Sequence, residues 1–386
     1  MEKAVKVKIV TPSIINPFFW YAVTWTLSLY LYNISKSRLN IPLALGTKVF
    51  IASTIIISIA LAIGVNLYLK NKEATIKYIE PSTIGVCFLW VLYLADFLYS
   101  RTVPLFSNLY KNFGFPTLHV ISVTFGTYYC IRSIFQFLIF KEKKDIKVAI
   151  IILLYYVLIF SRGLIVFILI ASILPYIATK RISFKQVAII VMVAIVSAWV
   201  YGIAGNIRSG MDWNDSGLIL SVAEIKANRY SLTAPFYWVD EYLINSLRNL
   251  NYNIAQVPVN NSFSGFIYFF IPDFISKRLV SSIPQGAVLV KEEFTTTTMY
   301  GNLYACSGYL GMIINYITYA ICGLIAILAK AKNSLFQFLG MAIMSFLFML
   351  SMFDNMLWYS GFSFALIWIV IVALFKPYLY KVAIKI

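Results

Sequence analysis

The hydrophobic runs of this chain stop at Gly205-Asn206-Ile207-Arg208 and resume at Thr298-Met299-Tyr300-Gly301. Residues 205–300 between these points are mixed in polarity, whereas the flanking sequence consists almost entirely of long apolar runs. We therefore expect three parts: a membrane bundle over 1–204, a large loop over 205–300 and a second membrane bundle over 301–386. A single large polar loop on a protein with many spans is where we expect the chemistry.

The overall composition is that of an integral membrane protein. The 386 residues are 61% hydrophobic and 12% charged, which is more apolar surface than a soluble domain of this length can bury. The net charge of +17 comes from short clusters between the apolar runs, and such clusters indicate topology and not a nucleic-acid patch. The four cysteines lie in or beside apolar runs and have neither metal-ligand spacing nor a disulfide framework, so we interpret them as packing residues.

The apolar runs predict an all-α polytopic membrane protein with about ten spans. A helix needs about 20 apolar residues to cross a bilayer core of about 30 Å. The predicted spans cover residues 14–33, 48–69, 82–100, 117–139, 146–160, 163–179, 186–204, 303–329, 334–352 and 356–375.

The fifth and sixth runs are short, and only Ser161-Arg162-Gly163 separates them. Lysine-rich clusters at 141–147 and 180–185 flank the pair with the same cytoplasmic signature, so the chain must cross outward and return. We therefore interpret the runs as two helices, with a break recessed below the outer surface. Ten spans place both termini in the cytoplasm and the large loop outside.

The type of basic residue differs between the two predicted sides. The cytoplasmic segments hold 18 of the 32 basic residues, and 17 of these 18 are lysines. The external segments hold seven arginines and six lysines. Arginine presents a planar fork that binds phosphate or carboxylate through two hydrogen bonds, so this bias predicts an external mouth that binds an anionic group. Ordinary ion pairing within loops is the alternative explanation.

Four external arginines are candidate ligands of a phosphate group. Arg162 lies in the recessed break, where a charge needs a partner or an aqueous cavity unless it snorkels to the interface. Arg208 directly follows the seventh run, beside two glycines that suit an anion-binding turn. Arg101 and Arg248 are further candidates. In the simplest interpretation, Asp96 near the outer end of the third run is the ion-pair partner of Arg101.

The candidate general bases are one histidine and three carboxylates. His119 is the only histidine and lies at the outer end of the fourth run. Imidazole titrates near neutral pH, which suits a general base, although a single interfacial histidine can also be structural. Asp240, Glu241 and Glu293 in the large loop are the alternative bases.

Three segments of the large loop have helical or interfacial character. Residues 217–231 and 235–250 carry apolar side chains at helical spacing, so both are predicted to be amphipathic helices. Residues 263–270 are too short to span a membrane and too apolar for water. We expect them to dip into the membrane interface or to pack on the helix bundle.

The sequence carries no motif for a nucleotide or a metal. It lacks a phosphate-binding Walker loop, a dinucleotide fingerprint, a Cys/His cluster and a nucleophile elbow, and a single histidine excludes a multi-histidine metal site. We therefore expect no cofactor and no metal. Energy must come from an activated substrate or from an ion gradient.

Taken in order, these features resemble the bacterial O-antigen or capsule repeat-unit polymerases, which are related to the O-antigen ligases. The resemblance covers mainly residues 145–325. It rests on the break at 161–163, on the exit from a span at 201–208, on the one large external loop and on the return at 298–311, where Leu303-Tyr304 is followed by two glycines. The ligases carry a histidine in the large loop, and this chain has none there, which argues against a ligase.

The resemblance implies a membrane glycosyltransferase that transfers a growing glycan from undecaprenyl diphosphate to a sugar hydroxyl of the next lipid-linked repeat unit. It implies the bacterial inner membrane as location, and a flippase and a chain-length regulator as partners, with no nucleic acid. The external arginines would bind the diphosphate, and a histidine or carboxylate would act as base. The competing interpretation is a transporter or flippase of lipid-linked glycans, which predicts internal repeats and charged or broken helices near the bilayer midplane.

Overall fold

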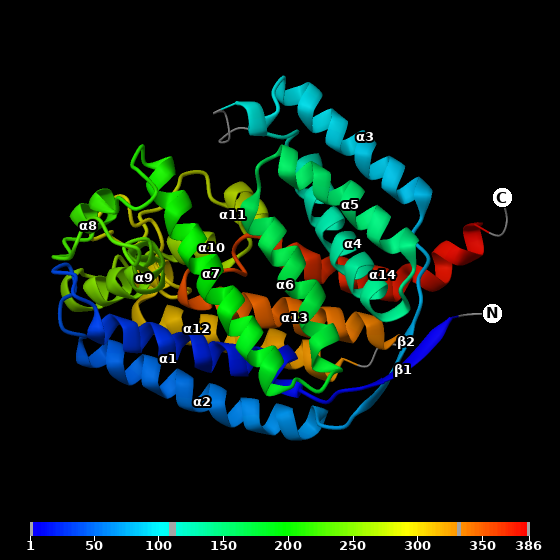
Figure 1. The fold of residues 1–386 in the computed structure, drawn as a ribbon, viewed down its shortest axis with the longest axis horizontal. Coiled ribbons are helices and arrows are strands. Elements are labelled where there is room, and N and C mark those ends of the chain that lie inside the picture. The colour runs from blue at the N-terminus through cyan, green and yellow to red at the C-terminus, as the bar shows by residue number, and fades with distance from the viewer. Residues whose placement is uncertain (1–2, 108–112, 330–332, 384–386) are drawn as a thin grey trace.

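Helices make up most of the computed structural model, which describes residues 3–107, 113–329 and 333–383 (Figure 1). Each of the ten predicted apolar runs overlaps one long helix. These helices are α1 Pro17–Ile34, α2 Leu45–Leu69, α3 Thr83–Ser100, α4 Leu118–Phe140, α5 Lys143–Leu158, α6 Arg162–Ala178, α7 Phe184–Arg208, α12 Gly301–Leu328, α13 Ser334–Met349 and α14 Ser360–Ala383. Short 3₁₀ turns lie at η1 Pro12–Ile15, η2 Pro104–Phe106 and η3 Leu350–Met352.

Several of these helices are long and apolar enough to cross a membrane. Six meet this description within the described residues, namely α2, α3, α4, α7, α12 and α13 with its η3 extension. Helix α6 and residues 360–374 of α14 are apolar but shorter. A helix satisfies its own backbone hydrogen bonds, which is what a segment in hydrocarbon requires. The fold is therefore that of a mostly helical membrane protein, as the composition predicted.

Local sequence signals set the ends of these helices. Asn16 starts α1: its side chain accepts hydrogen bonds from the amides of Phe18 and Phe19, and Pro17 occupies the first helical position. The break predicted at 161–163 is confirmed, because α5 ends at Leu158 and α6 begins at Arg162. Phe160 between them has a φ of 55°, a left-handed conformation that does not occur in a regular right-handed helix.

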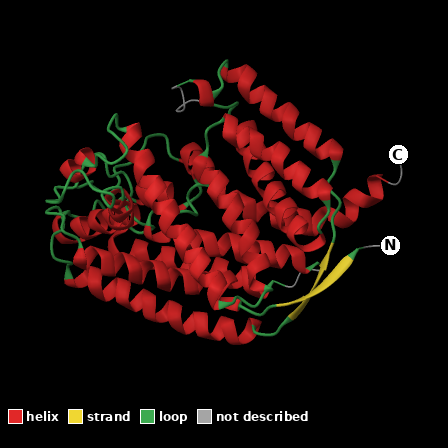
Figure 2. Cartoon of the chain, viewed as in Figure 1, coloured by secondary structure: helices red, strands yellow, loops and turns green. Residues whose placement is uncertain are grey.

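The expectation of a purely helical chain needs one correction. The strands β1 Ala4–Lys8 and β2 Glu73–Lys77 form a two-stranded antiparallel sheet, seen beside the N-terminus in Figure 2. Both strands alternate apolar and polar residues, the pattern of a half-buried strand, and Ile76 of β2 is fully buried. The sheet joins the N-terminal segment to the link between α2 and α3.

Helix α13 is the centre of the bundle, and α7 lies at its edge. In an 18-residue stretch of α13, 83% of the residues are buried, against 6% for α7. Helix α13 packs against α1, α6, α12 and α14, whereas the main packing partner of α7 is a helix of the large loop. Exposed isoleucine, valine and methionine side chains cover α7, as expected of a helix that faces lipid.

The connecting segments gather at two opposite ends of the bundle. At one end, Val10 donates a hydrogen bond to the carbonyl of Ala178, and the Asn333 side chain accepts one from the amide of Lys77. At the other end, Ser37 forms an isolated β-bridge with Ile225, and the Asn251 side chain accepts from the amide of Ala44. The first end holds the N-terminal segment, and the second holds residues 205–300 (Figure 1).

Residues 205–300 form four helices: α8 Gly217–Val222, α9 Phe236–Gln256, α10 Phe263–Phe270 and α11 Asp273–Leu279. The predicted helix over 235–250 is confirmed as α9, which continues to Gln256. The predicted helix over 217–231 is wrong beyond Val222. The chain turns at Glu224, where φ is 53°, so that Tyr230 can form a β-bridge with Asp215.

Helices α9 and α10 pack the large loop against the bundle. Helix α9 packs against α1, α7 and α12, and its buried Asn249 holds the segment 290–296 through bonds to the backbone of Val290, Phe294 and Thr296. Helix α10 packs on α12, which confirms that residues 263–270 pack on the bundle. Helix α12 kinks at Gly308, where φ is 60°. Before the kink, the carbonyls of Ala305 and Cys306 accept hydrogen bonds from the amides of Asn260 and Ser262, which lead into α10.

Candidate functional site

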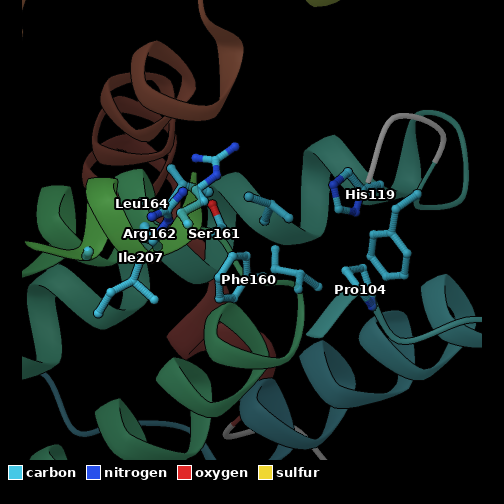
Figure 3. Close-up of a pocket in the computed structure, with 12 residues that line it drawn as sticks. Pro104, His119, Phe160, Ser161, Arg162, Leu164 and Ile207 are labelled. Carbon is cyan, nitrogen blue, oxygen red and sulfur yellow. The ribbon is translucent and has the colours of Figure 1, made fainter. Parts of the chain in front are cut away.

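A cavity of about 1020 Å³ lies at the end of the bundle that carries the large loop (Figure 3). Its walls come from the η2 turn, the start of α4, the break between α5 and α6, and the end of α7. This volume is at the upper end of the range typical of small-molecule sites. The lining residues are Pro104, Phe113, His119, Val123, Ile159, Phe160, Ser161, Arg162, Leu164, Ala204, Ile207 and Arg208.

The α5–α6 break supplies one positive wall. Arg162 is the first residue of α6, and Ser161 before it makes no side-chain cap hydrogen bond. The first-turn amides of a helix have no carbonyl partner within the helix and carry partial positive charge. The Arg162 guanidinium lies 5.2 Å from the centre of the Phe160 ring, which holds it at the break. An anion in this wall would meet both the guanidinium and the start of the helix.

The end of α7 supplies the second arginine. Arg208 lies in the last turn of α7, and Asn206 anchors this turn by accepting from Trp238 Nε1 at 2.6 Å and donating to Ser216 Oγ at 3.1 Å. From the sequence, Gly205 and Gly210 were predicted to let an anion approach the backbone beside Arg208. In the structure Gly205 lies against the Trp238 ring instead, where a Cβ atom would come within 2.8 Å of it.

Neither arginine has a carboxylate partner among the residues that the structure describes. In the described part of the chain, no aspartate or glutamate lies within ion-pair distance of Arg162 or Arg208. Both side chains are exposed. Their charge is therefore available to a bound anion, and the cavity brings together two of the four arginines that the sequence analysis selected.

His119 faces the same cavity and is held by two buried side chains. Its Nδ1 atom lies 2.9 Å from Asp96 Oδ2, and the Tyr155 hydroxyl donates to the same oxygen at 2.6 Å. The side chains of Asp96 and His119 are 0% and 27% exposed. Because Asp96 occupies Nδ1, the atom Nε2 is the ring nitrogen left for a ligand. Figure 3 shows His119 on the opposite wall from Arg162.

The loop before α4 is built around this histidine. Gly114 has a φ of 102°, and a Cβ atom there would come within 2.6 Å of His119 Nδ1. The Gly114 amide donates to Ser100 Oγ, and the amide of Phe115 donates to Asp96 Oδ1, both at 2.8 Å. Asp96 therefore fixes the loop and the imidazole together.

The predicted pairing of Asp96 with Arg101 is replaced by this arrangement. Asp96 points into the bundle toward α4 and α5, whereas Arg101 is the exposed residue that ends α3, with a φ of 50°. Sequence analysis missed the link between Asp96 and His119. A signal existed, because both residues lie near the outer ends of consecutive runs, and two antiparallel neighbouring helices place such residues at similar depth.

The other predicted site residues do not line this cavity. Arg248 and Glu241 are both 0% exposed and pair with each other, with a shorter distance of 2.8 Å from Arg248 Nη1 to Glu241 Oε2. Burial raises the pKa of Glu241, an effect that Arg248 opposes, and burial also raises the pKa of the half-buried Asp240. Glu293 is exposed and lies at a second, smaller pocket that Glu241 also lines. Arg101 lies three residues before Pro104, outside the cavity wall.

The chemistry available in the cavity is anion binding combined with proton transfer. Two arginines and a helix start form a positive region, and a histidine oriented by a buried carboxylate forms a proton acceptor. Over the described ranges, histidine, cysteine and acidic side chains form no group of three or more that could hold a metal ion. No family model, curated protein or solved structure matches the chain.

Proposed function

We propose that the chain is a membrane glycosyltransferase that polymerises undecaprenyl-diphosphate-linked oligosaccharide repeat units into a surface polysaccharide, O-antigen or capsule. One observation carries the proposal: Arg162, Arg208 and His119 line a single cavity, although they come from three helices. Phosphate binding and base catalysis are the two functions that this transfer needs from a protein. The resemblance of residues 145–325 to the repeat-unit polymerases points to the same reaction.

In the proposed step, a hydroxyl oxygen of the acceptor sugar attacks the anomeric carbon of the donor glycan. A new glycosidic bond forms, and the bond from that carbon to the diphosphate oxygen breaks. Undecaprenyl diphosphate leaves with the bonding electrons, and Arg162 and Arg208 stabilise its added negative charge. His119 Nε2 takes the hydroxyl proton, while Asp96 stabilises the resulting imidazolium. Asp240, Glu241 and Glu293 are the alternative bases.

We further propose ten spans with both termini in the cytoplasm of a bacterium and the cavity at the outer face of its inner membrane. The gathering of the connecting segments at two ends supports this topology. Residues 3–11, 70–81 and 178–183, all predicted to be cytoplasmic, contact one another directly through β1, β2 and the Val10–Ala178 hydrogen bond. The predicted external segments 35–44 and 205–300 meet at the other end.

The substrate and partners follow from the proposed reaction. A lipid-linked oligosaccharide is the donor and the acceptor, a flippase delivers it to the outer face, and a chain-length regulator acts on the product. The competing proposal is that the chain is itself a transporter or flippase of lipid-linked glycans. Transport of the same substrate would also use a cavity with arginines, but it would need no oriented base.

The test is polymerisation by the purified full chain in lipid nanodiscs, with lipid-diphosphate repeat units from the source bacterium. We expect a ladder of products in EDTA and without nucleotide. Replacement of the base in His119→Ala should lower turnover by about 100-fold or more, with donor binding retained. Translocation without polymer would support the transporter. If chelation abolishes activity and a metal restores it, the arginine-based mechanism is wrong. Full activity of His119→Ala would move the base to Asp240, Glu241 or Glu293.

A further inference from the structure

A second pocket, of about 140 Å³, lies beside α9 on the same end of the molecule. Aromatic rings form part of its wall: Trp238 and Tyr242 from α9, and Phe353 from the link between α13 and α14. The rings of Tyr242 and Phe353 are stacked, with centroids 6.0 Å apart and an angle of 20° between their planes. The Trp238 indole is fixed by its hydrogen bond to Asn206. These rings form a rigid aromatic surface.

The polar wall of this pocket includes a carboxylate that can accept hydrogen bonds and an amide that can donate them. Glu293 is exposed and has no ion pair or hydrogen bond to another described residue. The Asn245 carbonyl oxygen lies 3.0 Å from the hydroxyl oxygens of Ser246 and Thr296, which are hydrogen-bonded to each other at 2.6 Å, so it accepts from this pair of hydroxyls. These bonds fix the amide orientation, so the Asn245 NH₂ group remains as a donor. The carboxylate of Glu241, which also lines the pocket, is already paired with Arg248.

This combination fits the chemistry of a sugar ring. The C–H face of a pyranose is apolar and packs on aromatic rings, and each hydroxyl both donates and accepts hydrogen bonds. An anionic ligand is disfavoured because Glu241 and Glu293 both line the pocket. A metal ion is disfavoured because Glu241 is paired with Arg248, and the described residues offer no group of three ligands here.

The pocket is connected to the arginine cavity through two tyrosines. The ring of Tyr242 meets the ring of Tyr201 on α7 edge to face, with centroids 5.4 Å apart. Tyr201 precedes Ala204 and Arg208 on α7 by about one and two turns, and both of these residues line the arginine cavity. Gly205 on α7 also lies against the ring of Trp238, so the pocket and the arginine cavity both adjoin the last two turns of α7.

We propose that this pocket is a saccharide subsite, which binds one pyranose ring of a glycan whose reaction takes place in the arginine cavity. The placement of this ring relative to the cavity rests on the proposed function. Tyr242 and Phe353 supply the stacking surface, Glu293 accepts from a sugar hydroxyl, and Asn245 donates to another. The subsite selects a neutral sugar, since a uronic acid would meet the carboxylate of Glu293.

The subsite can be tested by binding to the full chain in nanodiscs, with two separate probes. One probe is the delipidated repeat-unit oligosaccharide of the source bacterium, and the other is inorganic pyrophosphate. Glu293→Gln should weaken oligosaccharide binding about tenfold, because a hydrogen bond to a charged acceptor is lost. Its matched control is Glu292→Gln, an exposed neighbour outside the pocket, which should bind as the wild type does. Pyrophosphate binding should not change in either variant.

Tyr242→Ala provides a second variant, which should also weaken oligosaccharide binding about tenfold through the loss of a stacked ring. Equal oligosaccharide binding by the wild type and Glu293→Gln would overturn the inference even if Tyr242→Ala fails to fold. Failure of the wild type to bind the oligosaccharide while it binds pyrophosphate would overturn the subsite and leave the proposed function in place. In a third outcome, the wild type binds the oligosaccharide, Glu293→Gln weakens that binding, and the wild type does not bind pyrophosphate. This result would support the subsite and overturn the arginine site.

A kinetic experiment separates the two sources of the sugar. In the polymerisation assay, the donor and the acceptor are varied one at a time for Glu293→Gln and Glu292→Gln. A KM raised for the acceptor alone supports a subsite for the acceptor sugar, and a KM raised for the donor alone supports one for the donor glycan. If Glu293→Gln leaves both KM values at those of the wild type, the inference is wrong.

Discussion

His119 Nδ1 lies 2.9 Å from Asp96 Oδ2, in a chain with no other histidine. The two residues belong to consecutive helices, and Asp96 is fully buried and bound also by Tyr155 and by the amide of Phe115. A buried carboxylate is costly unless hydrogen bonds satisfy it, and here three such bonds converge on one side chain. The pairing leaves the Nε2 atom of His119 for a ligand in the cavity that Arg162 and Arg208 also line.

Asp96→Asn tests whether this carboxylate positions the base. The amide can no longer stabilise an imidazolium or select the tautomer with a proton on Nδ1, so we expect the kcat for polymerisation to fall about tenfold to 100-fold. Pyrophosphate binding should be unchanged, since Asp96 does not line the cavity. Asp96→Glu should recover part of the lost kcat. A loss of pyrophosphate binding equal to the loss of kcat would indicate a structural role only.

Arg162→Lys and Arg208→Lys test whether the two arginines bind diphosphate. Lysine keeps the charge but loses the two-pronged hydrogen bonding, so we expect polymer formation to fall about tenfold while protein abundance stays near that of the wild type. The control is Arg181→Lys, an exposed arginine in the link between α6 and α7 at the opposite end of the molecule. Long-chain glycan at normal levels from both Arg162→Lys and Arg162→Ala would exclude the role of Arg162.

The raised pKa of Asp354 predicts that the stability of the fold depends on pH. Burial raises its pKa to about 6, although Tyr359 OH and the Asn355 amide both donate to it at 2.7 Å. An unfolded aspartate has a pKa of about 4, so between about pH 4 and pH 6 the folded protein holds a proton that the unfolded chain has released. The free energy of unfolding should therefore decrease as pH rises through this window.

Thermal unfolding in detergent at a series of pH values measures this effect. Asp354→Asn keeps the side-chain shape without the ionisation, so its melting temperature should depend less on pH between about 4 and 6 than that of the wild type. Asp212→Asn, at an exposed position of the large loop, serves as the control. Parallel pH profiles for the wild type and Asp354→Asn would contradict the prediction.

The ten-span topology can be tested with reporter fusions. Fusions at Lys144 and Lys180 should report the cytoplasm, because both positions lie at the end of the bundle that holds the N-terminal segment. An external reporter is best inserted at Ser282, an exposed position of the large loop, since Asn251 in α9 is fully buried. Exterior signals at both Lys144 and Lys180 would exclude the topology.

The sequence alone was sufficient for the ten long helices and for the break between α5 and α6. Ten apolar runs predicted the positions of ten helices. The lysine clusters on both sides of residues 146–179 correctly indicated two helices, α5 and α6, where one long helix was the alternative. These features are local: a helix forms through hydrogen bonds between residues four apart, and an apolar run long enough for a bilayer is visible in composition. The helix at 235–250 and the packed segment at 263–270 were predicted on the same basis. The helix at 217–231 failed because Asp215 and Tyr230 pair across it, a contact that no local pattern reveals.

Only the tertiary structure decided which polar residues meet. The sequence showed Asp96, His119, Arg162 and Arg208 as polar residues near the outer ends of four runs, and it could not show how each helix is rotated about its axis. Rotation places Asp96 against His119 and not against Arg101, and it turns the face of α9 that carries both Glu241 and Arg248 into the fold. The energy of these contacts depends on burial and on distances of about 3 Å between residues far apart in the chain, which a linear pattern does not contain.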